Sequence, residues 1–216
     1  MRFGAGVPKA FSDLSGMSLL EHAVARQAAV ERVTAVIVAV PADHVDTATS
    51  ALATASTDPA MSTPVTVIAG GVLRQDSVRR MLAAVPPHTT HVLVHDAARA
   101  LAPPELSDRV IDALAAGQDA VIPVLPVVDT LATVSDDLVI GTVPRDGVRI
   151  VQTPQGFAYN LLLRAHRETP HEWEATDDSS MVRRLGAVVH TVPGERAAIK
   201  ITTPEDRLIA QALLLA

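Results

Sequence analysis

The chain has 216 residues, 48% of them hydrophobic, and a formal net charge of −6; these values suit one folded domain of ordinary size and exclude an intrinsically disordered chain. The acidic balance and the aromatic content of 2% argue against a broad nucleic-acid-binding face and against a base-stacking platform. Cysteine is absent, no apolar run approaches the roughly 18 to 20 residues of a membrane helix, and the N-terminus shows no signal-peptide core, so we expect a cytoplasmic protein without disulfide or thiolate chemistry.

The first part of the chain predicts alternating helices and strands. Residues 1–17 predict a loop, because glycine and proline interrupt any regular period there. Ser18 and Glu21 form a capping box, which predicts a helix to about Ala29. The elements predicted next are a strand over 33–40, a helix capped by Asp43 that reaches about Ala55, a strand over 65–69 and a helix over 74–84.

The strand over 65–69 ends in Gly70-Gly71, and Arg74 begins the helix that follows. A strand, a glycine-rich turn and a helix start leave backbone N–H groups free, which is one way in which proteins bind a phosphate or a nucleotide. Glycines also make tight turns where no ligand binds, and the pattern by itself favours that simpler interpretation.

The next predicted strand, over 91–95, ends abruptly at Asp96, two alanines and Arg99. Ligands of open α/β sheets bind beyond the carboxyl ends of the strands. A carboxylate and a guanidinium there suit a polar or phosphorylated ligand, although an ordinary solvated ion pair gives the same pattern. His91 and His95 share a face of this strand but lie about 13 Å apart, so one metal ion cannot bind both.

The rest of the chain continues this rhythm with one interruption. Pro104 and Gly117 bound a predicted helix, and a strand follows over 120–124. Residues 125–152 lack a helical period and contain two hairpin turn signals, so we expect an arm that projects from the body. The remaining predictions are a helix near 159–167, a helix over 177–185 capped by Thr176, strands over 188–192 and 198–201, the latter carrying Lys200, and a final helix capped by Thr203.

Strands that alternate with helices predict an α/β fold with a doubly wound, mostly parallel sheet and helices on both faces. We expect residues 1–216 to form a single domain, with an arm at about 125–152 that makes a dimer. Such folds usually open with a strand, whereas this chain opens with a predicted loop.

Several ordered blocks of the chain resemble the bacterial 2-C-methyl-D-erythritol 4-phosphate cytidylyltransferases, which have a Rossmann-like nucleotidyltransferase fold. The resemblance runs from Arg2 to the C-terminus, and the His-Asp-Ala-Ala-Arg block over 95–99 is its most specific part. The other blocks are Arg2 with Pro8-Lys9, Gly70-Gly71 with Arg74 and Ser77, Asp129-Thr130, Thr153-Pro154-Gln155, Thr176-Asp177-Asp178 and Ile199-Lys200-Ile201-Thr202.

The resemblance implies a homodimeric transferase that joins CTP to 2-C-methyl-D-erythritol 4-phosphate and releases pyrophosphate, with Mg²⁺ held mainly by the triphosphate. An acceptor phosphate oxygen attacks the α-phosphorus directly, so the protein supplies positioning and charge neutralisation. By resemblance, Arg2 and Lys9 stabilise the transition state. The resemblance assigns nucleotide binding to Gly71, Arg74, Ser77, Asp96 and Ala97, and binding of the methylerythritol phosphate to Arg99, Thr130, Arg145, Thr153 and Lys200, with Thr130 and Arg145 coming from the partner's arm.

The chain also departs from the family's pattern. The family begins with a buried strand and a Gly-rich loop ahead of the position of Arg2, and without them we expect two neighbouring strand edges inside the sheet to be exposed. We therefore expect the codons upstream of Met1 to encode such a strand and loop. Ala132 stands where relatives often carry lysine. Asp177 and Asp178 are interpreted only as a helix N-terminus that favours anions, outside the site.

Three functional readings follow from this resemblance. The first, which we favour, is an active cytidylyltransferase. The second is an N-terminally truncated, inactive homologue that acts as a nucleotide-binding or dimerising partner. The third is a nucleotidyltransferase for another sugar or alditol phosphate. The upstream codons distinguish the first two, a substrate panel distinguishes the third, and none of them involves nucleic acid or a membrane.

Overall fold

The computed structural model describes residues 8–55, 63–170 and 172–215, and the predicted site residue Arg2 lies outside these ranges. The α-helices are α1 (Leu19–Ala28), α2 (Val45–Ala55), α3 (Arg74–Ala83), α4 (Pro104–Ala115), α5 (Tyr159–Glu168), α6 (Asp178–Arg184) and α7 (Pro204–Leu214). The strands are β1 (Asp13–Leu14), β2 (Met17–Ser18), β3 (Val36–Val40), β4 (Val65–Ala69), β5 (His91–Val94), β6 (Ala120–Pro126), β7 (Leu131–Ser135), β8 (Leu138–Val143), β9 (Arg149–Val151), β10 (Gln155–Ala158) and β11 (His190–Pro193). Short 3₁₀ helices cover Lys9–Phe11, Ala42–His44 and Ala97–Arg99.

Most strands of the body run in one direction, as predicted. β3 pairs with β4 in parallel, and β6 pairs with β11 in parallel. β10 lies antiparallel between β5 and β6, so β5 and β6 share a direction. β4 and β5 end at the same edge, because Arg74, which follows β4, binds Asp96, which follows β5. β9 and β10 are therefore the antiparallel members of a mixed arrangement.

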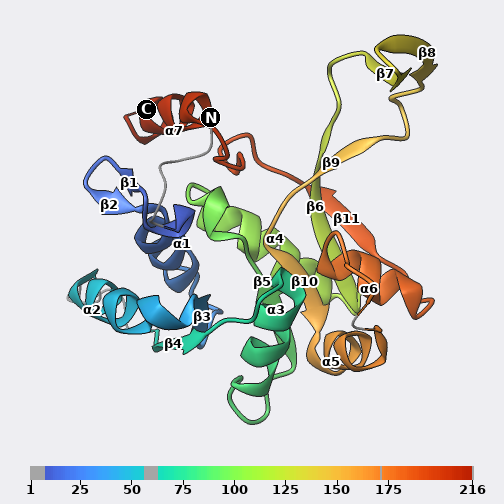
Figure 1. Ribbon diagram of the computed structural model, residues 1–216. Coiled ribbons are helices and arrows are strands. Elements are labelled where there is room, and N and C mark those ends of the chain that lie inside the picture. Colours follow the sequence, from blue (N-terminus) through green and yellow to red (C-terminus); the bar gives the residue numbers. More distant parts are fainter. Residues whose placement is uncertain (1–7, 56–62, 171, 216) are drawn as a thin grey trace.

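Helices cover both faces of these strands (Figure 1), which confirms the doubly wound α/β prediction. On one face α4 packs against β6, β10 and β11, and α1 lies beside α4. On the other face α3, α5 and α6 enclose a core in which Phe157, Leu162 and Met181 are fully buried. Among the described helices, none has the length and apolar character needed to cross a bilayer.

The predicted arm leaves the body as a β-hairpin (Figure 1). β7 pairs with β8, and the turn between them is made by Asp136 and Asp137, whose φ angles are 47° and 65°. The chain returns to the body through β9, which pairs with β6. The arm exposes large apolar side chains, namely Val128, Val134, Leu138, Val139 and Ile140. Such a gathering of apolar groups on a projection suits contact with another chain.

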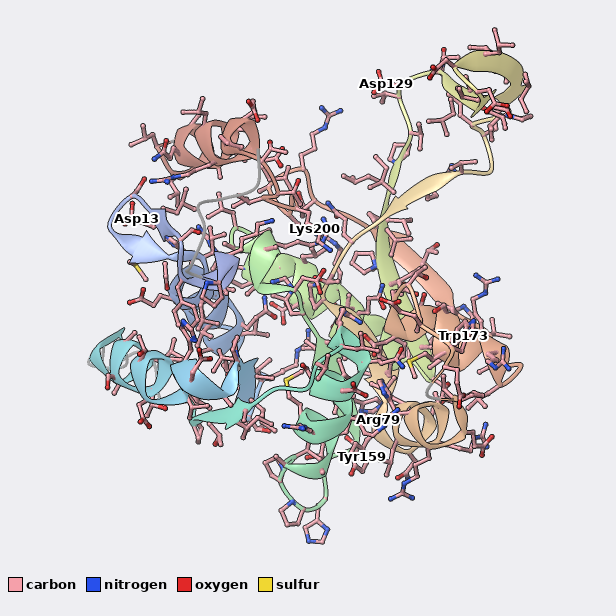
Figure 2. All side chains as sticks on the ribbon, viewed as in Figure 1. Asp13, Arg79, Asp129, Tyr159, Trp173 and Lys200 are labelled. Carbon is pink, nitrogen blue, oxygen red and sulfur yellow. The ribbon has the colours of Figure 1, made fainter. Side chains whose placement is uncertain are left out.

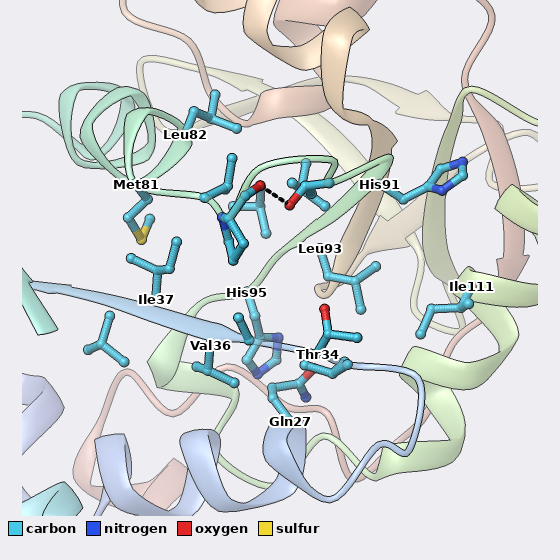
Figure 3. A pocket seen from close by; sticks show the side chains of 18 of the residues that line it. Gln27, Thr34, Val36, Ile37, Met81, Leu82, His91, Leu93, His95 and Ile111 are labelled. Atoms are coloured by element: carbon cyan, nitrogen blue, oxygen red, sulfur yellow. Dashed lines mark hydrogen bonds between the residues drawn. The ribbon is translucent and has the colours of Figure 1, made fainter. Parts of the chain in front are cut away.

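A cavity of about 600 Å³ separates β3 from β5 (Figure 3), and we call it the β3–β5 cavity. Within the described residues β3 pairs only with β4, and β5 only with β10, so each strand keeps one unpaired edge. Residues of both strands line the cavity, together with residues of α1, α3 and α4 such as Val24, Met81 and Leu114. The structure thus contains the two exposed interior strand edges that the sequence led us to expect.

Helix starts were predicted with mixed success. The N-caps predicted at Ser18 and Thr203 are confirmed, each with its reciprocal capping box. Asp43 caps no α-helix, because it lies in a 3₁₀ helix and α2 begins two residues later. Asp177 rather than Thr176 is the N-cap of α6, and its carboxylate accepts the N–H of residue 180 at 2.9 Å. Aspartate is the stronger capping residue of the two.

Strand predictions failed where pairing with residues distant in the sequence decides whether a strand forms. β10 was not among the predicted elements, yet it pairs on both sides, and Gly156 leaves room for the side chain of Val110. Residues 198–201 form no strand, and their backbone instead binds the segment after β5. The loop predicted up to residue 17 contains the short hairpin of β1 and β2.

Candidate functional site

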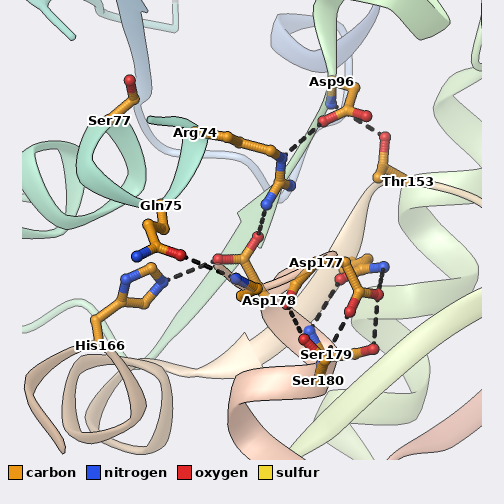
Figure 4. A network of polar contacts seen from close by, with 12 residues as sticks. Arg74, Gln75, Ser77, Asp96, Thr153, His166, Asp177, Asp178, Ser179 and Ser180 are labelled. Atoms are coloured by element: carbon orange, nitrogen blue, oxygen red, sulfur yellow. Dashed lines mark hydrogen bonds and ion pairs between the residues drawn. The ribbon is translucent and has the colours of Figure 1, made fainter. Parts of the chain in front are cut away.

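Asp96 lies at the centre of the candidate site, just beyond the carboxyl end of β5. Arg74 Nε lies 3.2 Å from its Oδ1, and Lys200 Nζ lies 2.9 Å from its Oδ2 (Figure 4 shows the Arg74 contact). Three segments that are distant in sequence therefore meet here. Burial favours the neutral form of Asp96, but the charges of Arg74 and Lys200 outweigh it and keep the pKa of Asp96 below its ordinary value.

Lys9 adds a further cation to this cluster. It begins a 3₁₀ helix and lies close enough to Lys200, Asp206 and Asp96 for their charges to act on it. Burial and the positive charge of Lys200 lower the pKa of Lys9, and the two carboxylates partly offset that effect. The ammonium group of Lys200 is half-exposed. A phosphate group that enters the site can therefore meet cations contributed by both ends of the chain.

Thr153 fixes the backbone beneath Asp96. Its Oγ1 accepts the N–H of Asp96 at 3.1 Å and lies 3.0 Å from Nδ1 of His95. Burial lowers the pKa of His95 to about 4, so the ring is neutral at pH 7 and its Nδ1 can accept the hydroxyl hydrogen of Thr153. His95 directly follows the last residue of β5. The described residues contain no group of three or more side chains that could hold a metal ion.

The Gly70-Gly71 turn packs tightly against the start of α3. A Cβ on Gly71 would overlap Asp76, so only glycine fits there. The N–H of Gly71 donates to Ser77 Oγ at 3.0 Å, and that hydroxyl donates to the carbonyl of residue 73 at 3.3 Å. The turn is therefore closed onto its own helix. It lies beside β4's carboxyl end, and the 3₁₀ helix that Ala97 begins follows β5 at the same edge.

Arg99 lies beneath the site, with both terminal nitrogens bound to backbone. Nη1 donates to the carbonyl of Ala198 at 2.7 Å, and Nη2 donates to the carbonyl of Val151 at 2.9 Å. Arg99 is buried, and it joins the end of β5 to β9 and to the segment that carries Lys200. Its observed contacts therefore hold Lys200 in place.

Thr130 and Arg145 lie in the arm, and the structure does not bring them to Asp96. Both are exposed, and Arg145 Nη1 donates to the carbonyl of Val128 across the base of the hairpin. Figure 2 shows the neighbouring Asp129 out on the arm, away from Lys200. A role for Thr130 and Arg145 in the site therefore requires an arm from a second chain.

Asp178, which the sequence analysis placed outside the site, and His166, which it did not single out, extend the cluster into the interior. Asp178 Oδ2 lies 2.6 Å from Arg74 Nη1, and His166 Nε2 lies 2.9 Å from Asp178 Oδ1 (Figure 4). Asp177 performs the capping role that the sequence assigned to the Asp pair, whereas Asp178 is fully buried. No local pattern identifies this contact, because 104 positions separate Asp178 from Arg74.

The chemistry of this arrangement is the binding of anions. Cationic side chains gather beyond the carboxyl ends of β4 and β5, where open α/β sheets bind their ligands. Such groups stabilise the charge that redistributes during transfer of a phosphoryl-type group. Both oxygens of Asp96 already bind cations, so the carboxylate orients the cluster rather than forming a metal centre alone.

Comparisons with known proteins give one consistent result. Residues 1–216 match the family model described as IspD: 2-C-methyl-D-erythritol 4-phosphate cytidylyltransferase. A protein of that name from Rhodococcus jostii is 47% identical over 218 residues, which cover 99% of this chain and 90% of the relative. Another from Nocardia farcinica is 45% identical, with coverage of 99% and 89%.

Solved structures agree with the sequence comparisons. The crystal structure of 2-C-methyl-D-erythritol 4-phosphate cytidylyltransferase from Thermus thermophilus is 37% identical to this chain, with a TM-score of 0.80 and full coverage of both chains. The structure of 4-diphosphocytidyl-2C-methyl-D-erythritol synthase from Anaerococcus prevotii is 30% identical, with a TM-score of 0.84 and coverage of 99% and 92%.

Proposed function

Because the chain belongs to the 2-C-methyl-D-erythritol 4-phosphate cytidylyltransferase family, we propose that it transfers the cytidylyl group of CTP to 2-C-methyl-D-erythritol 4-phosphate. An oxygen of the acceptor's phosphate forms a bond to the α-phosphorus of CTP. The bond from that phosphorus to the bridging oxygen breaks, and pyrophosphate leaves. Two polyanions must approach each other in this reaction, and the gathering of Lys9, Arg74 and Lys200 around Asp96 is the observation that best supports it.

The proposal gives each part of the site a role. Lys9, together with Arg2, stabilises the charge around the α-phosphate in the transition state. The nucleotide is bound by the residues at the ends of β4 and β5, namely Gly71, Arg74, Ser77, Asp96 and Ala97. The methylerythritol phosphate is bound by Thr153 and Lys200 on the body, with Arg99 beneath them, and by Thr130 and Arg145 of a partner's arm.

We further propose that Mg²⁺ enters the site as a complex with CTP. Its ligands are then mainly triphosphate oxygens, which are the hard donors that this ion prefers. The donor set on the chain fits this mode, because it offers one carboxylate, Asp96, amid cations rather than a cage of acidic groups. When bound, the ion would neutralise phosphate charge and favour departure of pyrophosphate.

A homodimer in the cytoplasm completes the proposal. The projecting arm carries exposed apolar side chains, among them Val139 and Ile140, and two arms that exchange in a two-fold dimer would bury them. The same exchange would carry Arg145 from one chain to the body of the other. The relatives' names do not support transfer to a different sugar or alditol phosphate as the main activity.

The direct test combines the chain with CTP, Mg²⁺ and 2-C-methyl-D-erythritol 4-phosphate and follows pyrophosphate release together with ³¹P NMR of the product. Erythritol 4-phosphate, which lacks only the branching methyl group, is the matched control acceptor, and UTP is the control nucleotide. Faster transfer to another alditol phosphate would contradict the proposed acceptor. CTP binding without transfer to any acceptor would indicate an inactive nucleotide-binding homologue.

A further inference from the structure

A line of polar side chains runs from the α5–α6 interface to the centre of the site (Figure 4). His166 contacts Asp178 at 2.9 Å, Asp178 contacts Arg74 at 2.6 Å, and Arg74 contacts Asp96 at 3.2 Å. The first two residues are fully buried and Asp96 is mostly buried, whereas the side chain of Arg74 is partly exposed. Among the described residues, the hydrogen bonds of the Asp178 and His166 side chains therefore lead to Asp96 through Arg74.

Asp178 keeps a negative charge in the interior. Burial favours its neutral form, but the hydrogen bond with His166 and the charge of Arg74 outweigh it and hold the pKa of Asp178 below its ordinary value. A buried carboxylate is stable only when its oxygens are paired in this way. Each oxygen of Asp178 has one of these partners, so the carboxylate has a fixed orientation.

His166 holds the other side of Asp178. Its Nε2 faces the carboxylate, and its Nδ1 is buried with no hydrogen-bond partner among the described residues. An ionised carboxylate only accepts hydrogen bonds, so Nε2 of His166 is the donor in this contact. The ring belongs to α5 and the carboxylate to α6, so this hydrogen bond also links the two helices behind Arg74.

Arg74 transmits this orientation to Asp96. Its Nη1 is bound to the buried carboxylate, and its Nε then points at Asp96 Oδ1. A guanidinium is planar and rigid, so fixing one nitrogen restricts the direction of the others. Without Asp178, Arg74 would be free to turn into solvent, and Asp96 would keep only Lys200 as a partner among these groups.

We infer that Asp178 and His166 are positioning residues of this enzyme, which act on nucleotide binding through Arg74 and its contact with Asp96. The inference rests on the proposed function, because it deepens the role given there to Arg74 and Asp96. Neither positioning residue touches the ligand. Their contribution resembles that of the outer partners that orient the ligands of a metal site. Mutation of such partners typically lowers metal affinity or activity by about 10- to 100-fold.

The test compares Asp178→Asn, which keeps the shape but removes the charge, with Met181→Ala. Met181 is fully buried on the same helix and takes no part in the polar line, so Met181→Ala is the matched control for lost packing. We expect Asp178→Asn to raise the KM and Kd for CTP by about tenfold or more, and Met181→Ala, assayed equally far below its Tm, to change them by less than about twofold. Equal effects of the two variants would mean that Asp178 is merely structural.

Arg74→Ala closes a double-mutant cycle. If Asp178 acts through Arg74, Asp178→Asn should have almost no further effect on CTP binding in the Arg74→Ala background. His166→Met should weaken binding, and His166→Gln, which keeps a donor near the position of Nε2, should restore most of it. An Asp178→Asn effect that is as large without Arg74 as with it would overturn the inference.

A measurement without substrate keeps this inference separate from the proposed activity. In protein labelled with ¹⁵N-arginine, the Nε–H signal of Arg74, assigned by its absence in Arg74→Lys, should exchange slowly with water. Asp178→Asn should abolish that protection, and Met181→Ala should preserve it. Persistence of the slow signal in Asp178→Asn would refute the positioning role, whereas absence of cytidylyl transfer in the wild type would refute only the proposed function.

Discussion

Lys200 Nζ lies 2.9 Å from Oδ2 of Asp96, although 104 positions separate the two residues in the chain. The segment that carries Lys200 is held there by Arg99, whose Nη1 binds the carbonyl of Ala198 at 2.7 Å. Lys9 lies near the same pair, since the charges of both act on it. Lys9, Lys200 and Asp96 therefore belong to one body of one chain, whereas Arg145 lies on the arm.

Substitution of Lys9 should affect turnover more than binding. We expect Lys9→Ala to lower kcat by on the order of 10²- to 10³-fold, because the proposed function directs its charge at an α-phosphate whose charge redistributes in the transition state. The Kd for CTP, measured by calorimetry, should change far less. Lys9→Arg should keep part of the activity. If the affinity for CTP falls as much as kcat, Lys9 is a binding residue and the role proposed for it is wrong.

If the arms exchange between two chains, two inactive variants should complement each other in a mixed dimer. Lys9→Ala and Arg145→Ala should each be nearly inactive, because each lacks one cation of the proposed site. After they are unfolded together and refolded, half of the proposed dimers should be mixed, and each mixed dimer should have one intact site. Activity should recover to about a quarter of the wild-type value for random pairing in a two-fold dimer.

The matched control for this experiment pairs Lys9→Ala with Lys200→Ala. Both residues lie in the body of the same chain, so no mixed dimer contains an intact site. We expect no recovery in that mixture. Recovery there as well would show that refolding itself, rather than exchange of arms, restores activity, and failure of the Arg145→Ala mixture would place Arg145 in the site of its own chain.

The β3–β5 cavity should accept an added strand. Both strands present an unpaired edge to it, and helices cover its two faces, so an extended apolar peptide can satisfy the backbone of both. A peptide of about eight residues rich in Val and Ile, with lysines at its ends, should raise the Tm of the chain in a concentration-dependent way.

Hydrogen exchange identifies where such a peptide binds. The amides of Val36–Val40 and Val92–Val94 should gain protection when the peptide is present. A peptide of the same composition with proline at alternate positions cannot pair with a strand and should have no effect. A rise in Tm without protection of these two strands would mean that the peptide binds elsewhere.

The cap of α7 should make stability depend on pH. Hydrogen bonds from Thr202 and Thr203 lower the pKa of Asp206 from 3.8 to about 2. Because the pKa is lower in the folded chain, the stabilising contribution is fully present above about pH 4 and is lost as the pH falls through about 2. Asp206→Asn should reduce the free energy of unfolding at pH 7 by about 0.3 to 1 kcal/mol, because solvent screens this partly exposed carboxylate.

Thermal melts over a pH series measure this effect. The difference in Tm between Asp206→Asn and the wild type should be constant above about pH 4 and should shrink as the pH falls toward 2. Glu205→Gln, one position earlier in the same exposed turn, is the control, because it removes a charge but leaves the hydrogen bonds between Asp206 and residues 202 and 203 in place. A difference in Tm that is independent of pH would exclude the carboxylate of Asp206 as its source.

The sequence by itself determined the elements whose causes are local. Ser18 and Thr203 mark helix starts because a side chain three residues away completes each cap. The turn at Asp136 and Asp137 marks the hairpin because short polar residues tolerate positive φ. The residues that carry the family resemblance can also be recognised in the sequence alone, as can the alternation of most strands and helices.

Only the tertiary structure decided what depends on partners far along the chain. β10 forms because it pairs with β5 on one side and with β6 on the other. The residue types of Gln155 and Gly156 do not predict this pairing. Residues 198–201 have the sequence pattern of a strand but pair with no strand among the described residues, and Arg99 binds their backbone instead. In the sequence, Asp178 is one of two aspartates at the start of a predicted helix. Folding buries its carboxylate, and because a buried charge must be paired, it forms an ion pair with Arg74.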